Sequence, residues 1–248
     1  MKPSGNTILI TGGGSGIGEG LASELYRAGN SVIIAGRRRD MLEKVVATHP
    51  GMEARVLDIS NEQDIHRFAS DLTGEFPALN ILMNNAGIMQ LEQDIDPAIA
   101  DATITTNLLG PIRLTAALLP HLRTKADAAV INVSSGLAFV PYLGFPTYCA
   151  TKAALHSWTI ALGARLQKDG VEVIEIIPPA VQTELTPGQS SRKGIMSLPD
   201  FIAETMEGLT TSPTPAEIRV GAAKHLGGVV DDARFQAAFA QLNRLGSE

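Results

Sequence analysis

Short apolar runs of strand length alternate with longer amphipathic stretches along most of the chain, and this alternation constrains the fold more than any other feature. Most runs are apolar at nearly every position, as is typical of strands covered on both faces. Strands that alternate with helices predict a parallel sheet with right-handed crossovers. The predicted fold class is therefore α/β, with a doubly wound parallel β-sheet. The predicted strands lie at residues 7–11, 31–35, 54–58, 80–84, 129–135 and 171–177.

Three segments near the carboxyl end extend this prediction. Residues 217–227 are expected to supply a seventh strand, and residues 233–245 a last amphipathic helix. Residues 184–212 are rich in Pro, Gly and Ser around apolar side chains such as Leu185 and Phe201. We expect this segment to be a substrate loop that forms an apolar lid with a polar rim. The alternative is a short helix that packs onto the domain.

Size and charge limit the classes of protein to which the chain can belong. Its 248 residues fit one domain spanning 1–248, and its net charge of −6 argues against a nucleic-acid partner. The sequence has neither a membrane-spanning apolar stretch nor a signal-peptide pattern. One cysteine, Cys149, permits no internal disulfide, and the five histidines are scattered, so no metal site is expected. We expect a cytoplasmic protein with no membrane or nucleic-acid partner.

A glycine-rich turn follows the first predicted strand. In the stretch TGGGSGIGEG, Gly12, Gly16 and Gly18 frame a tight turn that opens a helix. Missing side chains let the backbone approach a pyrophosphate, whose charge the helix N-terminus stabilises. The preceding strand and following helix are the context that a dinucleotide site requires, although a purely structural turn would use the same glycines.

The ends of the second and third strands bear on the choice of nucleotide. Gly36 and Arg37 stand where many NAD-binding folds place a carboxylate for the ribose hydroxyl. Because an arginine suits a 2′-phosphate, NADP(H) is the preferred cofactor, with NAD(H) also accommodated. The alternative is a solvated basic run, a reading that applies more strongly to Arg38 and Arg39. Asp58 would either accept a hydrogen bond from adenine or cap the following turn.

Tyr148 and Lys152 stand four residues apart in the stretch PTYCATK. On a helix this spacing places both side chains on one face, one turn apart, where both can act on the same atom. A half-buried aromatic ring beside a solvated amine would show the same spacing.

Together these motifs resemble those of the short-chain dehydrogenase/reductase family, in its compact single-domain branch with a Tyr-x-x-x-Lys active site. The resemblance spans residues 7 to about 185, with the motifs in the family's order, and implies a Rossmann fold. The residues that carry it are Thr11, Gly12, Gly16, Gly18, Asn84, Asn85, Ala86, Gly87, Asn107, Ser134, Ser135, Tyr148 and Lys152.

The resemblance implies four catalytic residues. Tyr148 would be the general acid/base, while Lys152 would lower the pKa of its phenol and bind the nicotinamide ribose. Ser135 would hydrogen-bond the substrate oxygen and stabilise the charge that develops there. Asn107 would interrupt its helix and hold a water that links Lys152 to solvent.

The resemblance also implies a cofactor site and an oligomer. After the sixth strand the family often has Pro-Gly, whereas this chain has Pro178-Pro179, which stiffens the turn. Helices at about 103–123 and 147–168 would build a homodimer or homotetramer. The implied cofactor-binding residues are Thr11, Gly12, Ser15, Gly16, Ile17, Gly18, Arg37, Asp58, Ile59, Asn85, Ala86, Gly87, Tyr148, Lys152, Pro178, Val181 and Thr183.

Three functions remain for comparison. The first is an NADPH-preferring carbonyl reductase, reversible as an alcohol dehydrogenase, that acts on a small or medium apolar aldehyde or ketone. The second is a catalytically silent NADP(H)-binding sensor or scaffold, which predicts damage to the four catalytic positions. The third is a sugar-nucleotide epimerase or dehydratase, which the length and the glycine spacing disfavour. We expect the first.

Overall fold

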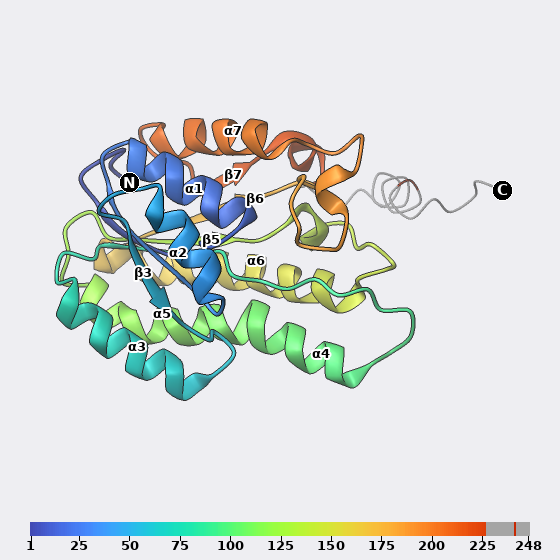
Figure 1. Cartoon of the computed structure of the whole chain (residues 1–248), viewed down its shortest axis with the longest axis horizontal. Coiled ribbons are helices and arrows are strands. Elements are labelled where there is room, and N and C mark those ends of the chain that lie inside the picture. Colours follow the sequence, from blue (N-terminus) through green and yellow to red (C-terminus); the bar gives the residue numbers. More distant parts are fainter. Residues whose placement is uncertain (227–240, 242–248) are drawn as a thin grey trace.

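In the computed structural model, the described residues, 1–226 and 241, contain one parallel β-sheet with helices on both faces (Figure 1). The strand order is β3-β2-β1-β4-β5-β6-β7. This arrangement confirms the predicted doubly wound α/β fold. The strands are β1 (Thr7–Thr11), β2 (Ser31–Gly36), β3 (Glu53–Val56), β4 (Ile81–Asn84), β5 (Ala129–Val133), β6 (Glu172–Ile177) and β7 (Glu217–Arg219).

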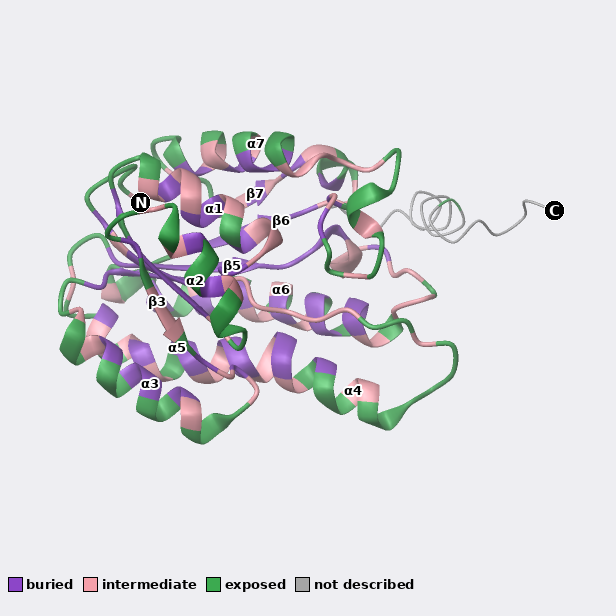
Figure 2. Cartoon of the chain, viewed as in Figure 1, coloured by how far each residue is buried: buried purple, intermediate pink, exposed green. Residues whose placement is uncertain are grey.

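The helices form two layers, and each layer buries one face of the sheet. Along β1, Ile8 and Ile10 belong to one apolar cluster, whereas Leu9 between them belongs to the other, because successive strand residues face opposite sides. The central strands are buried, and the outward faces of the helices are exposed (Figure 2). One layer contains α1 (Gly16–Arg27), α2 (Arg39–Ala47) and α7 (Leu198–Thr210); the other contains α3 (Glu62–Glu75), α4 (Pro97–Ile104), α5 (Gly110–Leu122) and α6 (Pro146–Leu166).

Several boundaries differ from the prediction for physical reasons. The third strand ends at Val56, before 58, and is partly exposed because β3 lies at the sheet edge. The fifth strand ends at Val133, since Ser135 accepts a hydrogen bond from the Leu137 N–H and starts a 3-10 turn. The seventh strand is short, and a 3-10 helix follows it at Gly221–His225. The last predicted helix, 233–245, lies outside the described residues apart from Gln241.

The segment expected as a lid divides into two parts. Residues 184–197 form an irregular loop that returns to the body of the protein, where Val181 and Met196 form an isolated parallel bridge. The following helix, α7, packs against α1, and its Phe201 side chain is fully buried. The lid interpretation is therefore wrong for α7, because its apolar face belongs to the core, and for the loop it stays a prediction.

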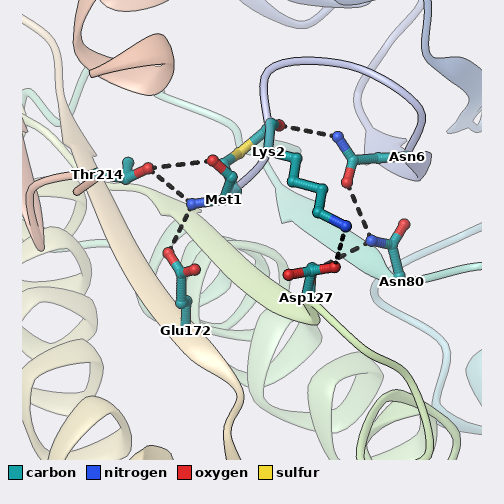
Figure 3. A network of polar contacts seen from close by, with 7 residues as sticks. All are labelled: Met1, Lys2, Asn6, Asn80, Asp127, Glu172 and Thr214. Carbon is teal, nitrogen blue, oxygen red and sulfur yellow. Dashed lines mark hydrogen bonds and ion pairs between the residues drawn. The ribbon is translucent and has the colours of Figure 1, made fainter. Parts of the chain in front are cut away.

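The amino-terminal residues connect the amino ends of several strands (Figure 3). The Met1 amino group donates to the Glu172 carboxylate of β6 at 2.7 Å. Asn80, just before β4, donates to Asn6 at 3.0 Å and to the carbonyl of Asp127 at 3.2 Å. These bonds fix the amino ends of β1, β4, β5 and β6.

The strand order reverses at β1, which pairs with β2 on one side and β4 on the other. At such a reversal the segments leaving neighbouring strands diverge to opposite faces, and ligands of open parallel sheets bind in the resulting crevice. Among the described residues, no helix combines the length and apolar character needed to cross a membrane.

Candidate active site

A cavity of about 730 Å³ opens at the carboxyl ends of the central strands. This volume lies within the usual range for small-molecule sites. Two predicted residues, Asn107 and Asp58, do not line the cavity, although each follows or precedes a lining residue in the chain. The predicted residues that do line it are Thr11, Gly12, Ser15, Gly16, Ile17, Gly18, Arg37, Ile59, Asn85, Ala86, Gly87, Ser135, Tyr148, Lys152, Pro178, Val181 and Thr183.

The glycine-rich turn is held against the end of β4. Gly12 has φ +68, in the region that favours glycine, and a Cβ atom there would lie 2.9 Å from the Cα atom of Ala86. A Cβ atom on Gly18 would overlap the carbonyl oxygen of Gly12. The first turn of α1, which begins at Gly16, lines the cavity, so its N–H groups are placed to bind an anion.

Thr11 and Asn85 join the diverging ends of β1 and β4. The Thr11 hydroxyl accepts hydrogen bonds from the N–H groups of Asn85 and Ala86, both at 3.1 Å. The Asn85 amide donates to the Thr11 carbonyl at 2.9 Å. The predicted cofactor residues at this point therefore also hold the crevice in shape.

The basic run after β2 contributes two arginines to the cavity. Arg37 lines it as predicted, and Arg38 lines it while donating to the Ser15 hydroxyl at 2.9 Å. Both side chains are exposed, so the solvated interpretation stays open for them, although the fold brings Arg38 to the glycine-rich turn. Arg39 does not line the cavity, and its side chain is 73% exposed.

Asp58 caps the turn that follows β3. Its carboxylate accepts from the Ser60 N–H at 3.0 Å and the Ser60 hydroxyl at 2.6 Å. Burial by itself would raise the pKa of Asp58, but these bonds and the charge of Arg37 outweigh it and lower that pKa. This geometry favours the capping alternative.

Tyr148 and Lys152 project from the first turns of α6, which begins at Pro146, and both are buried. The Lys152 amine lies 5.6 Å from the centroid of the Tyr148 ring and donates to the carbonyl of Val133 at 2.8 Å. The solvated-amine alternative is thus wrong. The amine is fixed at the carboxyl end of β5, beside the phenol.

The ionisation of this pair differs from the sequence-based expectation. Burial raises the pKa of Tyr148 to about 12, even though a hydrogen bond with Ser135 opposes the shift. Burial lowers the pKa of Lys152 to about 8. The expected lowering of the Tyr148 pKa is not found, because desolvation disfavours phenolate more than the hydrogen bond favours it. In this state the phenol is a proton donor at neutral pH.

Asn107 lies in a π-helical turn, Thr105–Leu109, between α4 and α5, which confirms the predicted interruption. Pro111 has no N–H to donate to the Asn107 carbonyl four residues earlier, which accounts for part of the distortion. The Asn107 side chain accepts from the Ile88 N–H and donates to the Ile88 carbonyl, both at 2.8 Å. It therefore ties the loop after β4 to the helix, behind the cavity wall.

The loop after β6 closes one side of the cavity despite its Pro178-Pro179 departure. The Pro178 carbonyl accepts from the Gly136 N–H at 2.8 Å, which joins the ends of β5 and β6. The Thr183 methyl carbon lies 3.3 Å from the position that a Cβ atom on Gly16 would take. Thr183 thus stands directly beside the first turn of α1.

Several lining residues were missed by sequence reasoning. Arg38 carried a signal, because it neighbours Arg37. Gln189 carried none, since it reaches the site only where its loop folds back and donates to the Val181 carbonyl at 2.8 Å. Further lining residues that were not predicted are Ile88, Met89, Gln90, Glu184 and Leu185.

These residues fit a nicotinamide dinucleotide. The helix N-terminus and two arginines suit a phosphorylated group, and the glycine-rich turn leaves its backbone uncovered. At the other end, a Cβ atom on Gly87 would lie 3.3 Å from the Asn107 amide oxygen and 3.8 Å from the Lys152 amine, so glycine keeps the space before Lys152 open.

Comparisons with known proteins agree with this geometry. The model of the family described as short chain dehydrogenase matches residues 6–194. Over 217 residues the chain is 37% identical to an uncharacterized oxidoreductase of Bacillus subtilis, DltE; the match covers 84% of this chain and 86% of the relative.

Two solved structures share the fold and differ in nucleotide. A short chain dehydrogenase from Burkholderia cenocepacia in complex with NADP has a TM-score of 0.83 at 28% identity, covering 98% of this chain and 99% of that one. A 3-ketoacyl-(acyl-carrier-protein) reductase from Brucella melitensis complexed with NADH has a TM-score of 0.78 at 27% identity, covering 86% and 93%.

Proposed function

Since the chain belongs to the short chain dehydrogenase family of nicotinamide-dependent oxidoreductases, we propose that it interconverts an aldehyde or ketone with an alcohol, using NADP(H) and Tyr148 as general acid/base. The observation that carries the proposal is the meeting of Tyr148, Lys152 and Ser135 in one cavity beside the glycine-rich turn. Three separate segments of the chain supply these groups: α6, the end of β5 and the turn before α1.

Carbonyl reduction adds a hydride to carbon and a proton to oxygen, and the nicotinamide supplies the hydride when bound. Tyr148 supplies the proton, since its phenol is protonated at neutral pH. Ser135, which is hydrogen-bonded to Tyr148, donates to the same substrate oxygen. The buried Lys152 ammonium stabilises the phenolate that remains. In the oxidation direction these proton transfers run in reverse.

Arg37 and Arg38 support a preference for NADP(H) over NAD(H). Both line the cavity near the end of β2, and a guanidinium binds phosphate through charge-assisted hydrogen bonds. Ser15 holds Arg38 at 2.9 Å, which reduces the entropy lost when it binds a phosphate.

The apolar part of the cavity lining supports an uncharged, largely apolar substrate. This lining includes Ile88, Met89 and Leu185. Among the described lining residues the charged side chains are Arg37, Arg38, Lys152 and Glu184. The first two belong to the nucleotide end and Lys152 is buried, so Glu184 is the charge left to face a substrate, and it repels anions.

The proposal extends to the oligomeric state of the protein and to its cellular compartment. Ile104 in α4 and Ile160 in α6 are exposed apolar residues on the helices where a homodimer or homotetramer would form. Cys149 is buried, and a protein with one unpaired thiol suits the cytoplasm. The single-domain organisation over 1–248 is proposed with them.

The decisive experiment mixes purified protein with NADPH or NADH and a panel of aldehydes and ketones, and follows nicotinamide absorbance for the wild type and Tyr148→Phe. We expect turnover with NADPH in the wild type and a loss of about a hundredfold or more in the variant. If both proteins bind NADPH and neither turns over any substrate in either direction, the silent sensor replaces the reductase.

A further inference from the structure

A row of polar side chains crosses the sheet next to Lys152. Asn84 in β4, Asn132 in β5, Glu175 in β6 and Glu217 in β7 are consecutive register partners. Glu175 is 1% exposed, and apolar side chains pack the rest of this face of the sheet. A carboxylate in such a place needs a partner to offset its lost hydration.

Only one of the two carboxyl oxygens of Glu175 has a hydrogen-bond partner among the described residues. Its Oε2 atom accepts from the His156 ring at 2.8 Å. Its Oε1 atom is buried and has no hydrogen-bond partner among the described residues. One oxygen of this buried carboxyl group thus has no group of the described protein to offset its lost hydration.

Aromatic and charged side chains cover one side of the hydrogen-bonded pair Glu175 and His156. The His156 ring stands edge-on to Phe139, with centroids 4.7 Å apart, and the Arg219 guanidinium lies 4.9 Å from the Phe139 centroid. Arg219 donates to Glu217 at 2.7 Å and 2.9 Å. Arg219 therefore balances Glu217 and leaves Glu175 to another cation.

Lys152 is that cation. It lies four residues before His156 on α6, so both side chains project from one face of the helix toward β5 and β6. Burial lowers the pKa of Lys152 to about 8, and the charge of Glu175 opposes this shift. The other charged or titratable groups around the two are Tyr148 and His156 on α6 and Glu217 and Arg219 on β7.

A bound metal ion is a weaker explanation of the same cluster. One ligand atom each of His156, Glu175 and Glu217 lie within 4.8 Å of one another. However, the Arg219 guanidinium already occupies Glu217, and the Lys152 ammonium lies nearby. With both cations present the two carboxylates are balanced, so a divalent ion would leave the cluster strongly positive.

We propose that Glu175, held in place by His156, is a positioning residue that keeps the buried Lys152 amine charged and directed at the active site. The inference rests on the proposed function, because Lys152 matters for turnover only if Tyr148 does. It adds to the four catalytic positions a fifth residue that touches neither substrate nor cofactor. Its influence reaches the chemistry through the charge of Lys152.

The test compares the pH profile of kcat for the wild type, Glu175→Gln and Glu217→Gln. Removing the Glu175 charge makes Lys152 lose its proton at lower pH, so the alkaline limb should move down by about one pH unit. Glu217→Gln removes a carboxylate that Arg219 already balances. The alkaline limb of its kcat profile should therefore stay within a few tenths of a pH unit of the wild-type limb. An alkaline limb that is the same in all three proteins overturns the proposal.

A second readout does not depend on activity. Between the folded and unfolded pKa values of Lys152, the unfolded chain binds more protons, so stability rises with pH in that window. In Glu175→Gln this rise should begin about one pH unit lower than in the wild type. A constant loss of stability at every pH would mean that Glu175 is merely structural, and would overturn the proposal even if the wild type proved inactive.

If Glu175→Gln fails to fold, Glu175→Leu replaces it in both experiments. It removes the same charge, fills a similar volume and introduces no unpaired buried amide. The same shift of the alkaline limb and of the stability curve is expected. If Glu175→Leu folds and neither curve moves, the proposal is wrong.

Discussion

Lys152 donates a hydrogen bond to the carbonyl of Val133 at 2.8 Å, which fixes a buried amine at the carboxyl end of β5. This contact links the helix that carries Tyr148 to the strand whose end carries Ser135. The candidate acid and the serine are thus held by one buried cation. The arrangement has measurable consequences for stability, cofactor choice and folding.

Lys152→Met should increase stability while it abolishes turnover. Burial lowers the Lys152 pKa from 10.5 to about 8, which corresponds to a cost of about 3 kcal/mol for holding the charged form at pH 7. This cost is what remains after the attraction of Glu175 has opposed the shift, and loss of the bond to Val133 offsets part of the gain. We expect the free energy of unfolding at pH 7 to rise by about 1–2 kcal/mol.

The pH dependence provides the check on this gain. The folded pKa is depressed, so wild-type stability rises as pH increases from about 8 toward 10.5, and the advantage of Lys152→Met should shrink over that range. Lys168→Met, at an exposed position, serves as the control and should show no such trend. A variant less stable than the wild type at pH 7 would contradict this account.

Arg37→Ala and Arg38→Ala should each weaken NADPH binding. Removing one guanidinium from a phosphate site should raise the KM for NADPH about tenfold and leave the KM for NADH nearly unchanged. Arg39→Ala is the matched control, since Arg39 does not line the cavity and lies 3.9 Å from Glu43. Equal effects of all three substitutions on both nucleotides would argue against a 2′-phosphate site.

Gly18→Ala should damage both stability and cofactor binding. The added Cβ atom would overlap the Gly12 carbonyl oxygen and lie 2.5 Å from the Asn85 amide nitrogen, so the turn must shift. We expect a loss of about 1–3 kcal/mol in urea unfolding and a weaker response to NADPH in thermal shift. Gly74→Ala, in an open position of α3, should instead stabilise by about 0.5–1 kcal/mol.

Asn107→Ala should destabilise the protein and reduce kcat together, because it removes both hydrogen bonds to Ile88. A cost of about 1–3 kcal/mol is expected from urea unfolding. The stability and kcat of Asn107→Asp should lie between those of the wild type and Asn107→Ala, since an aspartate can accept from the Ile88 N–H but cannot donate to the Ile88 carbonyl. Asn61→Ala, which removes only the N-cap of α3, should cost about 1 kcal/mol and leave kcat unchanged.

Much of the fold and many of the site positions could be predicted from the sequence, because the signals are local. Apolar runs and helical periodicity depend on neighbouring residues, so six strands were placed to within about two residues of their observed limits. The i,i+4 spacing of Tyr148 and Lys152 likewise fixes a shared helical face. The interruption at Asn107 followed from the family resemblance, and Pro111 supplies a local reason for it.

What the sequence by itself determined is therefore the order of elements and the residues at strand ends. The tertiary structure decided what those residues touch: Arg38 reaches Ser15, Lys152 reaches Val133, and α7 joins the core. It also decided that burial raises the Tyr148 pKa and that Glu175 meets His156. These outcomes depend on packing and desolvation between distant segments, and a periodic pattern along one segment carries no information about either.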